Sequence, residues 1–399
     1  MYMSSRKSFI YPTLRCIFKI GMKVFTSTLL IEKKVQLDYQ DLFYRFTESC
    51  ILLSSGSLDT GTWALKKALA GLDVTGATDL DNGVKSMFDK SLGISELSNN
   101  GKQDELTTDI NSFIAFEILP NLSTLITSLD KLQGICSNVA YYLIGPNMKT
   151  KNRMITTDNT VITLLENLTH VPHSSKSWKS IVGDAFFDMR FFNMPQKAYR
   201  QWKILIHSLM TVDKERFIDL INKVSSVPST NIFANREYES LTRALNLRRL
   251  SFAIFAGEKN SYMAQLPIVQ EKLVEVVRNN TITPTAQSEV YLCLRVLLCR
   301  VRSENLTTFW PIVLTELLRL FETVNVKDDT ITSNSEILPL LLSACKFLDT
   351  LLVLQNEDFQ VYQSLFITDT IDAKSNNKGG VIDKLGEIYK NIDVSFFFF

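Results

Sequence analysis

Apolar residues recur at helical spacing over most of the chain, and this feature limits the possible folds more than any other. Between about residues 107 and 355 they follow an i, i+3, i+4, i+7 pattern, and short polar or Pro/Gly breaks separate one segment from the next. We find no run of alternating Val, Ile and Thr residues bounded by two-residue turns. The sequence therefore predicts an all-α protein.

Capping residues predict where individual helices begin and end. Thr283-Pro284 gives an N-cap residue followed by proline at the first helical position, and Asp213 is a predicted cap of the helix that follows it. Gly145-Pro146 is expected to end a helix. No exact repeat of 34 or 40 residues is visible, yet each helix pair has to bury its apolar face on the next. We therefore predict an irregular α-solenoid of armadillo- or HEAT-like stacked helix pairs.

Changes in composition divide the chain into four parts. Glycines and a polar stretch weaken the pattern in the second part, and the last part contains a short apolar segment, Val381 to Tyr389. The predicted parts are basic and amphipathic helices over residues 1–70, a loop-rich connector over 71–106, a helical array over 107–355, and a tail with a short helix over 356–399.

The overall charge excludes one class of partner. The 43 Lys and Arg residues almost balance the 42 Asp and Glu residues, so the net charge is +1. No global field attracts the chain to nucleic acid or to anionic lipid, so any charge-driven contact must be local, and we expect no nucleic-acid partner. The six cysteines are scattered, which favours a reducing compartment where thiols act as small core residues.

Two segments were considered as membrane or targeting signals. Basic residues interrupt the apolar residues of the N-terminus, so no secretory signal is predicted, although a mitochondrial presequence remains an alternative. The most apolar stretch, Ile337 to Leu354, contains Lys346 and Asp349, and its apolar residues fall at helical spacing. We predict that this stretch is a core helix.

Residues that could support chemistry are few. Pro172 breaks the helix between His170 and His173, so this pair is a poor metal half-site, and His207 lies in an apolar helix. Phosphate-binding glycine motifs and the nucleophile-elbow motif are missing from the sequence. We therefore predict no catalytic residue, cofactor or metal, and no enzymatic activity. A hydrolase or transferase with a site assembled across distant helices is a third hypothesis, behind an interaction scaffold and a lipid-binding module.

Basic clusters are the candidate contact residues for lipid or protein partners. Residues 1–34 contain seven basic residues against one acidic residue, Glu32, and a second cluster lies in a break between helices. Such clusters contact anionic head groups, although a solvated charged face is the alternative. The candidate contact residues are Arg15, Lys19, Lys23, Lys149, Lys151 and Arg153.

Large aromatic residues within apolar helical segments are predicted core anchors. These residues are Trp178, Trp202, Phe252 and Trp310. Arg249 and Arg295 also lie within apolar helices, where an arginine often pairs with a carboxylate of the next helix, such as Glu271 or Glu316.

A series of ordered blocks runs through the helical array. The blocks are Trp178-Lys179, Phe186-Phe187, Phe191-Phe192, Trp202, and residues 209–213, 248–255, 266–273, 294–298, 306–312 and 343–349. In this order they resemble the C-terminal region of the Dopey family of Golgi and endosome trafficking proteins. They are helix cores and helix starts, so the resemblance indicates fold and lineage and identifies no catalytic residue. The array of residues 107–355 is then the Dopey-like part of the chain.

The resemblance implies a function and partners. Dopey proteins are very large peripheral proteins of endosome-to-Golgi transport, so this resemblance implies a non-enzymatic scaffold or adaptor at the cytosolic face of trans-Golgi and endosome membranes. The implied partners are a large Golgi scaffold related to Arf exchange factors and, as a further candidate, kinesin light chain. A peripheral module that binds phosphoinositides or other anionic lipids is the alternative function.

Overall fold

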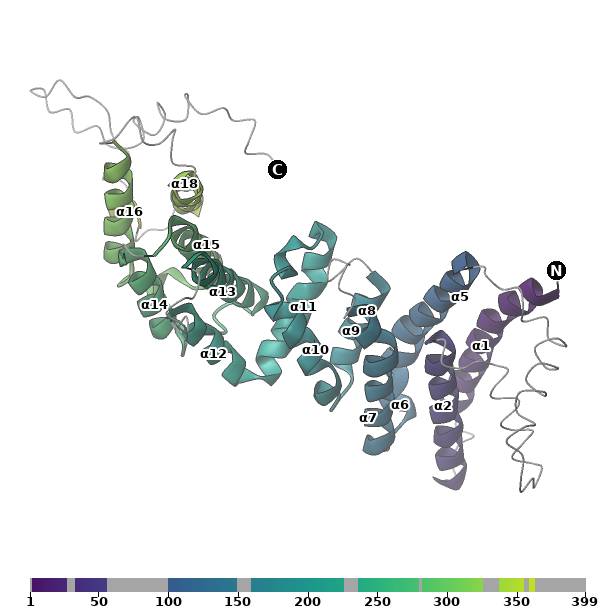
Figure 1. Ribbon diagram of the computed structural model, residues 1–399. Helices are drawn as coiled ribbons and strands as arrows, with labels where there is room; N and C mark the ends of the chain where they lie inside the picture. The colour runs from purple at the N-terminus through teal and green to yellow at the C-terminus, as the bar shows by residue number, and fades with distance from the viewer. Residues whose placement is uncertain are drawn as a thin grey trace, which may run out of the picture. The chain divides into compact units, whose positions relative to one another are not determined.

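The computed structural model describes eight segments of the 399-residue chain. They are residues 2–26, 33–55, 100–148, 159–225, 236–279, 282–325, 337–354 and 359–362. These segments are helices and short connections and contain no strand, which confirms the predicted all-α class. The predicted connector is described only from residue 100 onward, and the predicted Val381–Tyr389 helix lies outside the described segments. Two compact units, Met1–Leu209 and Met210–Phe399, divide the chain (Figure 1).

The first unit is built from helices of three types. Its elements are α1 (Tyr2–Thr26), α2 (Lys33–Ser54), α5 (Asn100–Phe113), the π-helix η2 (Ile114–Ile118), the 3₁₀ turn η3 (Leu119–Asn121), α6 (Leu122–Leu125), α7 (Leu129–Asn138), the π-helix η4 (Val139–Ile144), α8 (Gly145–Met148), α9 (Asn159–His170), α10 (Ser175–Phe187), the 3₁₀ turn η5 (Phe191–Asn193) and most of α11 (Gln196–Val212). α5 and η2 pack against α2 and α9, while α2 also contacts α7.

Aromatic rings fill two parts of the core of this unit. Phe18 of α1 lies 5.7 Å from Phe43 of α2 and 5.4 Å from Phe113 of α5, measured between ring centroids. Phe191 meets Trp202 of α11 edge-to-face, with centroids 5.0 Å apart. Such tilted and edge-to-face pairs stabilise a core beyond the burial of their area.

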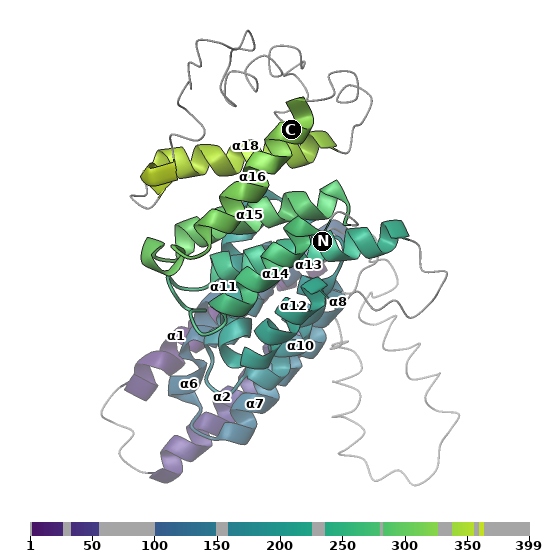
Figure 2. The same cartoon turned by 90° about the vertical axis from the view of Figure 1, so that its left-hand side faces the viewer.

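The second unit stacks long helices on one another. Its elements are α12 (Lys214–Ser225), α13 (Arg236–Ala256), α14 (Leu266–Arg278), α15 (Pro284–Arg300), the 3₁₀ turn η6 (Ser303–Asn305), α16 (Trp310–Asn325) and α18 (Ile337–Leu354). α15 lies between α13 and α18 and packs extensively on both, as the side view shows (Figure 2). α12 packs on α13 and α14, and α16 packs on α14 and α18.

Local sequence explains several helix ends. Thr283 is extended, with ψ 150°, and α15 begins at Pro284 as predicted, because the fixed φ of proline suits the first helical position. α12 begins at Lys214, directly after Asp213, which was also predicted. The expected stop at Gly145-Pro146 is wrong. Helical backbone instead continues from η4 through Gly145 into the short α8, which ends at Met148.

Candidate functional site

The predicted contact residues that the structure describes all lie on α1. Arg15, Lys19 and Lys23 are spaced i, i+4, i+8 and are exposed, so they form one basic strip along the helix. The other three predicted contact residues, Lys149, Lys151 and Arg153, lie outside the described residues. The candidate surface is therefore built on α1.

The inward face of α1 fixes which side of the helix points outward. Phe18 is buried between Phe43 and Phe113. A Cβ atom at Gly21 would overlap the Tyr39 hydroxyl of α2, so any larger residue here would require the Tyr39 side chain to move. Packing of Phe18 and Gly21 on α2 and α5 leaves the opposite side of α1 exposed.

An apolar ridge runs along the exposed side of α1 beside the basic strip. We call Ile17, Ile20 and Val24 the α1 ridge; their exposed fractions are 52%, 58% and 42%. They are spaced i, i+3, i+7, and Cys16, also exposed, lies between the ridge and the basic strip on the helix surface. The sequence prediction included the basic residues and missed the ridge, although a helical projection that placed Phe18 inward would have shown it.

Arg15 of the basic strip forms an ion pair with another helix of the first unit. Its Nε donates to Oε1 of Glu117 in the π-helix η2, at 2.5 Å, and both side chains are partly exposed. Such a partly solvated ion pair contributes at most about 1 kcal/mol. The pair joins α1 to η2, while the packing of Phe18 against Phe43 and Phe113 fixes the rotation of α1.

Three of the four predicted core anchors are buried. The indole Nε1 of Trp178 donates to Ser174 Oγ at 3.1 Å, and Trp202 and Trp310 are also buried. Phe252 is only half-buried. Leu247, Leu250 and Ile254 lie on a buried face of α13. Phe252 lies about 140° around the helix from Leu247, on the side of the exposed Phe255.

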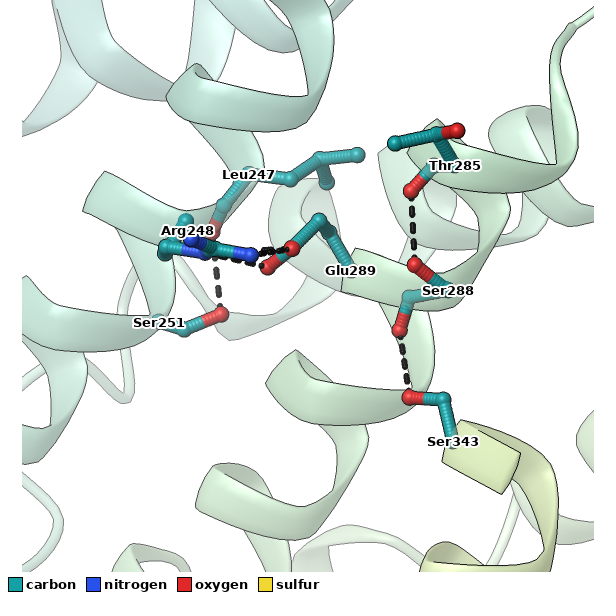
Figure 3. A network of polar contacts seen from close by, with 7 residues as sticks. All are labelled: Leu247, Arg248, Ser251, Thr285, Ser288, Glu289 and Ser343. Atoms are coloured by element: carbon teal, nitrogen blue, oxygen red, sulfur yellow. Dashed lines mark hydrogen bonds and ion pairs between the residues drawn. The ribbon is translucent and has the colours of Figure 1, made fainter. Parts of the chain in front are cut away.

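A polar network crosses the stack of the second unit (Figure 3). Nε of Arg248 in α13 donates to both carboxylate oxygens of Glu289 in α15, each at 3.1 Å. Ser343 of α18 donates to the main-chain oxygen of Ser288 at 2.8 Å. These contacts link α13, α15 and α18 in register.

Arg249 and Arg295 each form a hydrogen bond with a residue other than the carboxylates Glu271 and Glu316. Nη1 of Arg249, which is buried, donates to Asn246 Oδ1 at 2.9 Å, and Nε of Arg295 donates to Thr350 Oγ1 at 3.2 Å. The carboxylate of Glu316 instead pairs with Arg278 and Arg319. The Arg295 contact spans 55 residues and so leaves no local signal in the sequence, whereas Asn246 lies only three positions from Arg249.

The histidine and cysteine side chains of the described segments form no recognisable catalytic or metal-binding cluster. His170 and His173 are exposed, and no group of three or more His, Cys, Asp or Glu side chains that could hold a metal lies within the segments described. Burial raises the pKa of the Cys136 and Cys293 thiols to about 12, which disfavours the nucleophilic thiolate at neutral pH.

Two small clefts lie in the second unit. One is lined by apolar side chains of α14, α15 and α16 together with Tyr291 and Glu316, and the other lies beside Tyr262 and Arg300. Each has room for about one water molecule. Burial and the Glu316 charge raise the pKa of Tyr291 well above its usual range, so its hydroxyl stays neutral.

One helix in the described segments, α18, is long and apolar enough to cross a membrane by length and composition. A third of it is buried in this structure. The buried face includes Leu340, Ala344, Phe347 and Leu351, and the Phe347 ring lies 5.9 Å from Tyr291 of α15. This face of α18 packs on α15, as expected for a core helix of the second unit.

These observations define an all-helical protein in which packed helix faces bury the apolar core of the described segments and α1 carries a basic and apolar surface. A comparison with known families matches residues 2–395 to the family described as DOP1 C-terminal. The chain belongs to this family, which is the Dopey family. The match extends the resemblance from the blocks between residues 178 and 349 to almost the whole chain.

Curated relatives support this assignment. The chain is 28% identical over 298 residues to "Protein pad-1" of Caenorhabditis elegans, covering 70% of this chain and 12% of that protein. It is 27% identical over 265 residues to "Protein dop1" of Emericella nidulans (64% and 14%) and 27% identical over 375 residues to "Protein DOP1B" of Mus musculus (85% and 16%). The match thus spans between 12% and 16% of the length of these relatives. No solved structure matches the chain.

Proposed function

We propose that this chain is a non-enzymatic scaffold in vesicle trafficking between endosomes and the Golgi. Membership of the Dopey family carries the proposal, and the helix seams support it because they leave outer helix faces for docking. The proposed partner is a large Golgi scaffold related to Arf exchange factors, with kinesin light chain as a further candidate. The proposed location is the cytosolic face of trans-Golgi and endosome membranes.

The proposed architecture is an irregular α-solenoid with armadillo- or HEAT-like stacking. The succession of α13, α15 and α18 supports it, because each of these helices buries one face on the next. Small-angle X-ray scattering of the purified chain tests the proposal. A compact 399-residue globule has a radius of gyration of about 21 Å, so a value near that number contradicts the solenoid and a clearly larger one supports it.

The scaffold proposal is tested by affinity capture from cytosol and from Golgi membranes. The bait is the full chain, and the control bait is the heat-unfolded chain, which reports capture by unfolded protein. We expect an Arf-exchange-factor-like scaffold with the first bait and much less of it with the second. Failure to recover such a protein, also with a longer bait that includes the preceding parts of a DOP1 protein, contradicts the proposal.

A second candidate function is peripheral binding to anionic lipid. It is favoured by the exposed basic strip of α1, because each basic residue near an anionic surface adds about 1 kcal/mol of attraction. Vesicle flotation with and without anionic lipid at two salt concentrations tests it. Binding that changes neither with the anionic lipid content nor with the salt concentration would contradict an electrostatic contact.

A further inference from the structure

The α1 ridge is exposed although apolar side chains of the same helix are buried. Phe18 is 5% exposed, whereas each residue of the ridge is more than 40% exposed. At about 100° per residue, the centre of the ridge lies about 130° around the helix from the centre of the basic strip. α1 therefore has three faces: an inward face, the basic strip and the α1 ridge.

The charge of α1 has one sign. Residues 2–26 contain Arg6, Lys7, Arg15, Lys19 and Lys23 and no acidic residue. Arg15 pairs with Glu117, and Lys19 and Lys23 of the same strip are exposed. An anionic surface with an apolar interior matches both exposed faces at once.

We infer that α1 lies in the plane of an anionic membrane, with the α1 ridge inserted at the boundary between head groups and acyl chains. In this position the apolar residues lose contact with water, and the lysine side chains extend back to the anionic head groups. The inference rests on the second candidate function, lipid binding, and adds a mode of contact to it. An electrostatic contact needs only the basic strip, whereas insertion also needs the ridge.

A partner helix is the competing occupant of the ridge. It would bury Ile17, Ile20 and Val24, but it would have to supply acidic side chains at the positions of Lys19 and Lys23 as well. A bilayer containing anionic lipid offers negative charge all around the helix and needs no such register. The charge of α1 thus favours the membrane.

The experiment uses the full chain and two kinds of vesicle, pure phosphatidylcholine and phosphatidylcholine with 30% phosphatidylserine. A polarity-sensitive dye is attached to Cys16 in a chain carrying Cys299→Ser and Cys345→Ser, since Cys16 is exposed beside the ridge. We expect flotation and a blue shift of the dye only with the phosphatidylserine vesicles. Brominated acyl chains should quench the inserted dye.

Variants separate insertion from attraction. Ile17→Ser with Ile20→Ser should abolish the blue shift and weaken vesicle binding about tenfold, because about half of each isoleucine side chain is available for transfer. Lys19→Gln with Lys23→Gln should weaken binding about fivefold for each lysine. The matched control is Ile218→Ser with Ile268→Ser in the second unit, which removes two isoleucines of similar exposure and should change neither readout. Circular dichroism shows whether each variant keeps its helices.

Three results would overturn the inference. Salt-sensitive flotation with an unshifted dye and unaffected ridge variants would refute insertion and leave the electrostatic function standing. Lack of flotation with either vesicle would refute both. A blue shift without vesicles that grows with protein concentration would show that the ridge binds a second copy of the chain.

Discussion

The ion pair between Arg248 and Glu289 should respond unequally to loss of its two partners. The Glu289 side chain is 7% exposed and the Arg248 side chain 44% exposed. Arg248→Met leaves a buried carboxylate without its guanidinium, which should lower the free energy of unfolding by about 3 kcal/mol, the lower end for a broken buried pair because this pair is partly solvated. Glu289→Gln leaves an arginine that can turn to water, and should cost about 1 kcal/mol.

The double variant tests this reasoning more strictly than either single change. Arg248→Met with Glu289→Gln contains no buried carboxylate, so it should recover about 2 kcal/mol relative to Arg248→Met alone. Urea unfolding of the full chain, followed by circular dichroism, gives the free energies. Hydrogen exchange of peptides from α13 and α15 shows whether the loss of stability arises at the contact between these two helices.

Arg278→Met is the matched control, because Glu316 keeps a second guanidinium. Nε of Arg319 lies 3.4 Å from Glu316 Oε2, so the carboxylate stays paired, and we expect a loss below about 1 kcal/mol. Two results would refute the argument that burial of Glu289 makes the losses unequal. One is an equal loss of unfolding free energy in Arg248→Met and Glu289→Gln. The other is a double variant that is no more stable than Arg248→Met.

Three further predictions concern the core and two titrating groups. Trp202→Ala should lower the free energy of unfolding by about 3–5 kcal/mol in the same urea assay, because the side chain is fully buried and its loss opens a cavity. A thiol reagent at pH 8 should modify the exposed Cys16 at once, and Cys136, whose pKa is raised to about 12 by burial, only in denaturant; mass spectrometry of peptides distinguishes them. The hydrogen bond from Lys131 lowers the pKa of Asp41, so this pair stabilises the fold at neutral pH and less as the pH falls through that pKa. Lys131→Met should raise the pKa of Asp41 toward its ordinary value in an NMR titration.

Helix-forming patterns were readable from the sequence because they depend on near neighbours. The start of α15 at Pro284 and of α12 after Asp213 followed from capping residues, and the burial of Trp178 followed from the apolar residues around it. Phe252 shows the limit of that reasoning. Its surroundings are as apolar as those of Trp178, but the rotation of α13 against α15 decides which residues are covered, and local sequence does not encode that rotation.

Two kinds of feature could not be predicted. The π-helices Ile114–Ile118 and Val139–Ile144 have ordinary helical patterns in the sequence, and an i+5 bond differs from an i+4 bond only once the surrounding packing is fixed. The partners of Arg248 and Arg295 lie 41 and 55 residues away along the chain. The basic strip of α1 was visible in the sequence, whereas the ridge required knowledge of which side of α1 faces α2 and α5.

Polar contacts at the helix seams explain how apolar faces can hold a fixed register. Apolar contact is not directional, so two apolar helix faces could slide along one another at little cost. Gln40 Oε1 accepts bonds from the N–H and Oγ1 of Thr127, and Asn246 Nδ2 donates to the main-chain oxygen of Lys223. Each of these two buried amide side chains finds its partner at one register only, and leaving it unpaired is costly. Substitution of such a seam residue should therefore alter the spacing of outer helix faces, and so weaken a docked partner, without changing any residue that the partner touches.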